Sequence, residues 1–164
     1  MCTIGRMKKR ILFICSRNAC RSQMAEAILR HVGGDRFVAR SAGASPIGQI
    51  HPLASTALAL ADIPLVNQYS KGFDEVLQIE HDLIITLCDS AACHVPPAWP
   101  GRPVIAHWSL FDPVSYPGTG QEQIAVARGT ADKLRAWIEQ LVDLPLEDLD
   151  PEDIRTELVR IAET

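Results

Sequence analysis

A cysteine and an arginine near the N-terminus enclose a short polar loop. Its seven residues are Cys15, Ser16, Arg17, Asn18, Ala19, Cys20 and Arg21. An apolar run over residues 11–14 precedes the loop, and a helix-like stretch begins near Ser22. A strand followed directly by a helix leaves a tight loop whose backbone N–H groups can point at one tetrahedral anion. The guanidinium of Arg21 adds planar, forked donors. The pattern therefore predicts an oxyanion-binding loop with a sulfur nucleophile at its floor.

Cys15 stands where a thiolate is favoured over a thiol, beside Arg21 and at the start of a helix. The thiolate is the nucleophilic form of the side chain. Ser22 is placed to cap the helix and to donate to the Cys15 sulfur, and a cap alone is the simpler alternative. Asn18 tolerates the positive φ that a tight loop needs. The plain alternative for Cys15 is a small buried side chain that only packs.

The charge is unevenly distributed over the 164 residues, whose formal net charge is −4. Residues 1–40 carry nine Lys and Arg against two acids, and residues 41–164 carry seven against eighteen. The basic part contains the loop, but it has no long basic run and no interleaved aromatics, so we expect no nucleic-acid binding. No apolar stretch approaches the roughly 18 residues of a membrane span, so we expect no membrane association.

Five cysteines point to thiol chemistry in a reducing compartment. They are Cys2, Cys15, Cys20, Cys88 and Cys93. We expect a cytoplasmic protein, in which cysteines are more naturally catalytic, redox-active or metal-binding than members of a disulfide framework.

Strand-like and helix-like segments alternate along the chain. The expected strands are 10–14, 37–41, 82–87 and 103–107, and the expected helices are 22–32, 51–61, 70–78 with Ser70 as its cap, and one starting at Thr119. Thr119 and Glu122 form a capping-box pattern, followed by apolar residues at helical spacing. We expect an α/β fold, an open four-stranded parallel sheet with helices on both faces. Cys15 and Cys88 each follow a strand, so both belong at the carboxyl edge where such sheets bind ligands.

Three parts of the chain are expected. Residues 1–7 are expected to be an N-terminal extension, because the chain could equally well start at Met7. Residues 8–142 are expected to form the main domain. Residues 143–164 form an acidic tail, whose final helix starts at Asp150-Pro151. This tail either packs against the main domain or extends into solvent.

The loop resembles a known active site. Residues 15–26 are similar to the catalytic loop of low-molecular-weight protein tyrosine phosphatases and of the arsenate reductases built on their fold. Segments 41–43 and 84–88, Trp108 and the pair Asp112-Pro113 match that family in order and spacing. The resemblance implies the fold of these phosphatases and a general-acid role for Asp112. A simple Asp-Pro turn is the alternative for that pair.

Two later cysteines separate the two activities within this resemblance. A phosphatase needs only Cys15, Arg21 and Asp112, because water resolves its phospho-cysteine. A reductase also needs thiols that deliver two electrons, and the resemblance implies Cys88 as the first resolving cysteine and Cys93 as the second. We expect an arsenate reductase that binds arsenate, with phosphate or sulfate as competing oxyanions. A low-molecular-weight protein tyrosine phosphatase is the alternative.

The resemblance leaves the reductant open. Four residues separate Cys88 from Cys93, fewer than is general in thioredoxin-linked reductases. Arg17 stands at a loop position where glycine is usual. A basic residue there resembles the branch of arsenate reductases that uses glutathione and glutaredoxin. We expect no bound cofactor and an external thiol reductant, either thioredoxin or glutathione with glutaredoxin.

We expect no bound metal. Some members of the resembled family hold potassium near the loop, and Asn18, Glu26 and Ser41 match three of their ligands, but Lys71 replaces the acid. A zinc site is the alternative, with the thiolates of Cys15, Cys20, Cys88 and Cys93 as its four ligands, although the spacing within each cysteine pair is slightly wide. Cys20 either packs or, as the resemblance implies, forms a protective disulfide with Cys15.

Overall fold

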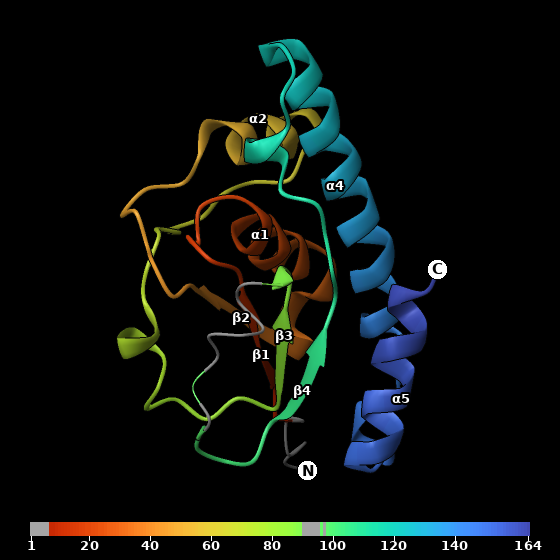
Figure 1. The fold of residues 1–164 in the computed structure, drawn as a ribbon. Coiled ribbons are helices and arrows are strands. Elements are labelled where there is room, and N and C mark those ends of the chain that lie inside the picture. The colour runs from red at the N-terminus through yellow and green to blue at the C-terminus, as the bar shows by residue number, and fades with distance from the viewer. Residues whose placement is uncertain (1–6, 90–95, 97) are drawn as a thin grey trace.

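The chain folds around one four-stranded sheet in the order β2-β1-β3-β4, and all neighbouring strands are parallel. The computed structural model describes residues 7–89, 96 and 98–164 (Figure 1). The strands are β1 (Lys9–Ile14), β2 (Phe37–Ala42), β3 (Leu83–Thr86) and β4 (Val104–His107). The expected open parallel sheet is confirmed, and the ends of β1 and β3 lie side by side because Ile14 pairs with Thr86.

Helices connect and cover the strands. They are α1 (Arg21–Gly33), α2 (Pro52–Leu60), α4 (Gly120–Val142) and α5 (Pro151–Ala162), with short 3₁₀ turns η1 (Gly34–Arg36), η2 (Phe73–Glu75), η3 (Pro113–Ser115) and η4 (Leu146–Asp148). Helix α1 packs against β2, β1 and α4, and α5 packs against β4. Figure 1 shows α4 and α5 on one side of the sheet and the segment that carries η2 on the other. None of the described helices is long and apolar enough to cross a bilayer.

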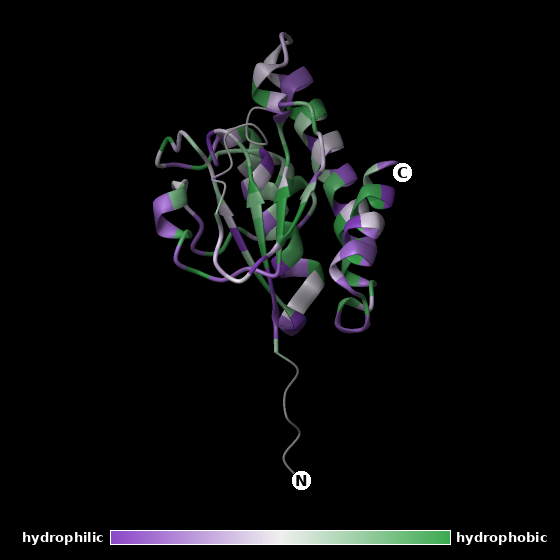
Figure 2. Cartoon of the chain, turned by 60° about the horizontal axis from the view of Figure 1, so that its bottom comes forward, coloured by the Kyte–Doolittle hydropathy of each residue, from purple (hydrophilic) through white to green (hydrophobic). Residues whose placement is uncertain are grey.

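The two central strands form the core. All of β3 and residues 11–14 of β1 are buried, as expected for parallel strands covered on both faces, and Figure 2 shows them as apolar. Helix α4 adds the residues expected from the helical spacing, because Ala127, Leu134 and Ile138 are buried. Its cap is also confirmed: the Thr119 hydroxyl accepts a hydrogen bond from the N–H of Glu122 at 3.2 Å.

The helix expected over residues 70–78 is wrong, because only the single turn η2 forms there. Ser70 does not cap it. The Ser70 hydroxyl instead donates to the carbonyl of Arg17 at 2.8 Å and accepts from the N–H of Ile47 at 3.0 Å. The long-range hydrogen bond from Ser70 to the loop of residues 15–21 thus outweighs the local helical propensity of this segment.

The C-terminal tail docks on the domain. The Asp150 carboxylate caps α5 by accepting from the N–H of Asp153 at 2.9 Å, and Leu158 and Ile161 are buried. Of the two alternatives left open by the sequence, the docked arrangement is therefore the one observed.

Candidate active site

The loop of residues 15–21 joins β1 to α1 and is held from outside by its carbonyl groups. The hydrogen bonds run from Ser45 N to Ser16 O (2.8 Å), from Ser70 Oγ to Arg17 O (2.8 Å), from Gln23 Nε2 to Asn18 O (3.0 Å) and from His51 N to Ala19 O (2.8 Å). A trans peptide holds each C=O antiparallel to the next N–H, so the N–H groups of residues 17–20 face the opposite way, into the hollow. Such a ring of N–H groups suits a tetrahedral oxyanion.

Asn18 and Gly43 give the loop its tight curvature. Asn18 has φ 48°, which confirms the expected positive value, and its Oδ1 accepts from the N–H of Lys71 at 2.9 Å. Gly43 packs so closely behind the loop that a Cβ there would lie 2.5 Å from the carbonyl oxygen of Cys15. The backbone of residue 43 therefore has room for glycine alone.

The Cys15 sulfur lies 2.8 Å from the hydroxyl oxygen of Ser22. The Lys71 N–H can only donate, so the Asn18 atom that it meets is the carbonyl oxygen, and the Asn18 amide nitrogen is the one that faces Ser22 Oγ at 2.8 Å. Because Ser22 Oγ already accepts from Asn18, its own hydrogen is left for the sulfur. The expectation that Ser22 caps α1 is wrong, since the helix begins one residue earlier with Cys20 at the cap position.

Arg21 closes the hollow on the far side. Its Nη1 donates to the carbonyl of Leu110 at 3.0 Å, and its Nη2 lies 3.6 Å from Asp112 Oδ2. The side chain is nearly buried, and among the described residues its Nε has no hydrogen-bond partner. A buried N–H without a partner is costly, so an anion bound here would satisfy it.

Asp112 belongs both to a turn and to the site. Its Oδ1 accepts from the N–H of Val114 at 3.0 Å at the start of η3, and its Oδ2 accepts from the Ser115 hydroxyl at 3.2 Å. The same carboxylate faces Arg21, and its side chain is about a third exposed. The two interpretations of Asp112 are therefore compatible, because the turn fixes the direction of the carboxyl group that faces Arg21.

These groups line one open cavity of 660 Å³. Its lining includes Cys15, Arg21, Cys88 and Asp112, together with exposed Arg17 and Phe111 at its edge. A tetrahedral oxyanion fills only a small part of such a volume, so the cavity has room for a larger group beside the loop.

Cys88 lies two residues beyond Thr86, the last residue of β3, at the same edge of the sheet where Cys15 directly follows β1. Its Sγ lies 3.3 Å from the hydroxyl oxygen of Ser16, the neighbour of Cys15, and the residue is 5% exposed. Cys93 lies outside the described residues.

Cys20 also borders the cavity but is poorly suited to attack. Burial, followed by the charges of Asp112 and Cys15, raises the pKa of its thiol to about 12. The thiol is therefore neutral at ordinary pH, and the structure contains Cys15 and Cys20 as separate thiols.

Lys71 places an ammonium group beside Glu26. Its Nζ lies 3.8 Å from Glu26 Oε1, which also accepts from the Ser41 hydroxyl at 2.9 Å. Burial lowers the pKa of Lys71, and the nearby charge of Glu26 opposes that change. Among the described residues no group of three or more His, Cys, Asp or Glu side chains could hold a metal ion.

Several anchors of the loop were not predicted from the sequence. Gln23 donates to the Asn18 carbonyl and to that of Tyr69, and Gln68 donates to Gln23 Oε1 at 2.8 Å. Gln68 and Tyr69 lie 45 and 46 residues from Gln23 along the chain. No local pattern marks them, although a buried glutamine in the first turn of a helix is itself a signal of a polar network.

Comparison with known proteins gives a consistent family. Residues 10–144 match the family model described as "Low molecular weight phosphotyrosine protein phosphatase". An arsenate reductase of Halalkalibacterium halodurans is 39% identical over 127 residues, covering 77% of this chain and 90% of the relative. A glutaredoxin arsenate reductase of Synechocystis is 28% identical over 134 residues, covering 82% of this chain and 96% of the relative.

A solved structure agrees. The thioredoxin-dependent arsenate reductase of Corynebacterium glutamicum superposes with a TM-score of 0.59 at 31% identity, covering 83% of this chain and 64% of that one. Sequence and structure thus agree with the resemblance of the loop. The chain belongs to the low molecular weight phosphotyrosine protein phosphatase family, in which the curated relatives named above are arsenate reductases.

Proposed function

We propose that this protein is an arsenate reductase that uses Cys15 as nucleophile and Cys88 as the first resolving thiol. Cys88 carries the proposal, because it lines the same cavity as Cys15 and its Sγ contacts the neighbouring Ser16 at 3.3 Å. Hydrolysis needs only Cys15, Arg21 and Asp112, whereas reduction of arsenate needs a second thiol within reach of Cys15. The similarity to arsenate reductases supports the same conclusion.

The first step is attack of the Cys15 thiolate on arsenate. The N–H groups of the loop and Arg21 hold the oxyanion, while the Ser22 hydroxyl stabilises the thiolate. A sulfur–arsenic bond forms and an arsenic–oxygen bond breaks. Asp112 gives its proton to the departing oxygen, which leaves as water.

The second step transfers the electrons. The Cys88 thiolate attacks the Cys15 sulfur, and the pair of electrons of the sulfur–arsenic bond stays on arsenic. Arsenic(V) becomes arsenic(III) and leaves as arsenite, while the two thiols become a Cys15–Cys88 disulfide. Cys93 then attacks Cys88, which releases Cys15 as thiolate and leaves a Cys88–Cys93 disulfide. This role of Cys93 rests on the resemblance to the arsenate reductases of the family.

An external thiol protein restores the two cysteines. The similar structure from Corynebacterium glutamicum is named a thioredoxin-dependent arsenate reductase, and the relative from Synechocystis a glutaredoxin arsenate reductase. We favour glutathione with glutaredoxin, because Arg17 puts an exposed cation at the edge of the cavity where a carboxylate of glutathione can pair with it. We place the reaction in the cytoplasm, whose thiol pools keep such a relay reduced.

One pair of assays separates reduction from hydrolysis. Reduced protein is given arsenate without any reductant, and released arsenite is measured; the same variants are tested for hydrolysis of a phosphate monoester. We expect Cys88→Ser to abolish arsenite release and to leave any ester hydrolysis intact, while Cys20→Ser keeps both. Arsenite release that survives Cys88→Ser would contradict the proposal, and ester hydrolysis with no arsenite from the wild type would identify a phosphatase.

A further inference from the structure

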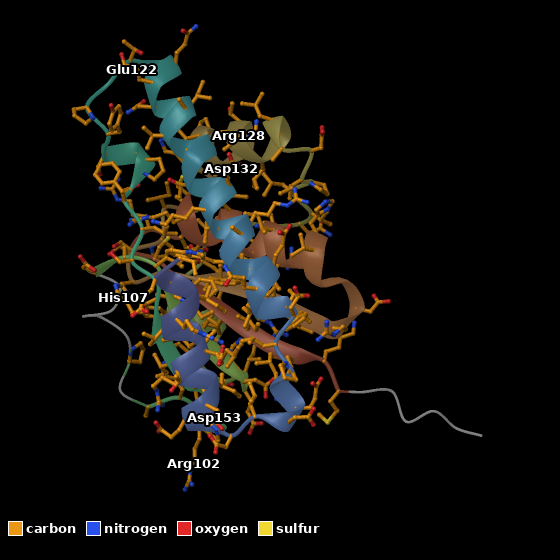
Figure 3. All side chains as sticks on the ribbon, turned by 90° about the vertical axis from the view of Figure 1, so that its right-hand side faces the viewer. Arg102, His107, Glu122, Arg128, Asp132 and Asp153 are labelled. Atoms are coloured by element: carbon orange, nitrogen blue, oxygen red, sulfur yellow. The ribbon has the colours of Figure 1, made fainter. Side chains whose placement is uncertain are left out.

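Helix α5 lies beyond the part of the chain that matches the family. The family match ends at residue 144, and α5 spans Pro151–Ala162. Figure 3 shows α5 beside the lower part of α4, and α5 also packs against β4, the strand at one edge of the sheet. This chain therefore adds an element to the strand that leads toward Asp112.

One hydrogen bond ties α5 to the residue that follows β4. Trp108 is fully buried, and its indole Nε1 donates to the backbone carbonyl of Leu158 in α5 at 2.9 Å. The Trp108 ring also meets Trp137 of α4 edge to face, with ring centroids 5.5 Å apart. A buried indole N–H needs a partner, so the bond to Leu158 sets the direction of the Trp108 ring.

The segment after Trp108 leads directly to the site. The N–H of Trp108 donates to the carbonyl of Thr86 at 2.7 Å, and that of Leu110 to the carbonyl of Leu87 at 3.0 Å. The Leu110 carbonyl in turn accepts from Arg21, whose other Nη faces Asp112. A shift of the Trp108 ring would therefore move residues 109–112 relative to the loop.

We propose that α5, through the bond between Leu158 and Trp108, positions residues 109–112 and with them the carboxyl group of Asp112. Trp108 is a positioning residue in this arrangement, and the tail of residues 143–164 is a working part of the enzyme. The inference rests on the proposed function for the role of Asp112. The backbone of the anion loop has separate anchors at Ser45, Ser70 and His51, so the tail acts on Asp112 and on the Arg21 guanidinium that the Leu110 carbonyl holds, and not on the loop N–H groups.

The first test measures the segment directly and needs no activity. Trp108→Phe keeps an aromatic ring and removes the N–H, and Leu158→Ala loosens the packing of α5 while the Trp108 side chain stays unchanged. The matched control is Trp99→Phe, the same change in a tryptophan whose ring packs on Phe73 and not on Trp108. In hydrogen exchange of the full chain we expect the amides of residues 109–112 to exchange about tenfold faster in the first two variants and nearly unchanged in the control.

The second test is a double-mutant cycle in single-turnover arsenate reduction. Trp108→Phe should lower the maximal rate about tenfold, with a smaller rise in the half-saturating arsenate concentration because the loop N–H groups stay in place. In an Asp112→Asn background the same change should cost less than about twofold, because the group it positions is already gone. Loss of folded protein would instead lower both backgrounds equally.

The two tests keep the two proposals apart. Unchanged exchange at 109–112, or equal losses in both backgrounds, would overturn the role of α5. A wild type that releases no arsenite would overturn the proposed function alone, and the exchange measurement would still decide whether α5 holds the segment.

Discussion

The Ser22 hydroxyl stands between two polar groups, with its oxygen 2.8 Å from Cys15 Sγ and 2.8 Å from Asn18 Nδ2. Because Asn18 donates to that oxygen, the single hydroxyl hydrogen is directed at the sulfur. Asn18 is itself held by the backbone N–H of Lys71. The nucleophile is therefore oriented by a relay that begins in a segment far away in sequence.

Ser22→Ala should make the Cys15 thiolate less available. The charge-assisted hydrogen bond is lost and the Asn18 amide is left without its acceptor, so alkylation of Cys15 by iodoacetamide at neutral pH should slow about tenfold. Ser45→Ala is the matched control, because Ser45 supports the loop through its backbone N–H and its side chain is exposed. Equal alkylation rates in Ser22→Ala and the wild type would refute the relay.

Gly43→Ala should distort the anion-binding loop, because Gly43 packs directly against the loop backbone. Its Cβ would lie 2.5 Å from the carbonyl oxygen of Cys15 and 2.8 Å from the N of Asn18, and these backbone atoms cannot move without deforming the loop. We expect loss of anion binding and a fall of about 2 kcal/mol or more in unfolding free energy, measured by urea denaturation. The control is Gly129→Ala in α4, where nothing lies within 4 Å of the new Cβ. That change should stabilise by about 0.5–1 kcal/mol, and equal effects at both positions would contradict this account.

Acid should destabilise the protein through His81. The residue is 3% exposed, and burial, together with the charges of Arg40 and Arg10, lowers its pKa from 6.5 to about 4. The unfolded chain therefore takes up a proton as the pH falls through 6.5, whereas the folded protein does so only near 4. Stability from the neutral imidazole is full above about pH 6.5 and is lost progressively down to about pH 4, by an amount of up to about 3 kcal/mol.

His81→Leu should remove most of this pH dependence. Urea midpoints measured between pH 4 and pH 7 should be flatter for His81→Leu than for the wild type. His31→Gln, a change at an exposed histidine near the end of α1, should retain the slope of the wild type. The same slope in His81→Leu would show that another group titrates in this window.

Potassium should not stimulate the enzyme. The ammonium group of Lys71 lies 3.8 Å from Glu26 Oε1, and Arg30 Nη1 lies 3.1 Å from Glu26 Oε2, so this carboxylate already has two cations. A further cation near Lys71 would be repelled. Arsenate reduction should proceed at the same rate in potassium and sodium chloride of equal ionic strength. A potassium-specific increase would show that a site exists despite Lys71.

The sequence predicted the parts that local patterns determine. The apolar runs that became β1 and β3, the capped start of α4 and the positive φ of Asn18 each follow from a few neighbouring residues. The expected helix over residues 70–78 is wrong for a nonlocal reason, because Ser70 is used to hold the carbonyl of Arg17. Contacts such as that between Trp108 and Leu158 join residues fifty apart, and no periodicity encodes them.

The most direct test of the central claim is disulfide mapping after one turnover. Fully reduced protein is incubated with arsenate and no reductant, quenched with an alkylating agent and digested for mass spectrometry. We predict one Cys88–Cys93 disulfide and one arsenite for each protein molecule, and a trapped Cys15–Cys88 disulfide in Cys93→Ser. Cys15, Cys88 and Cys93 all recovered as alkylated thiols, or arsenite formed with Cys88 alkylated throughout, would contradict it.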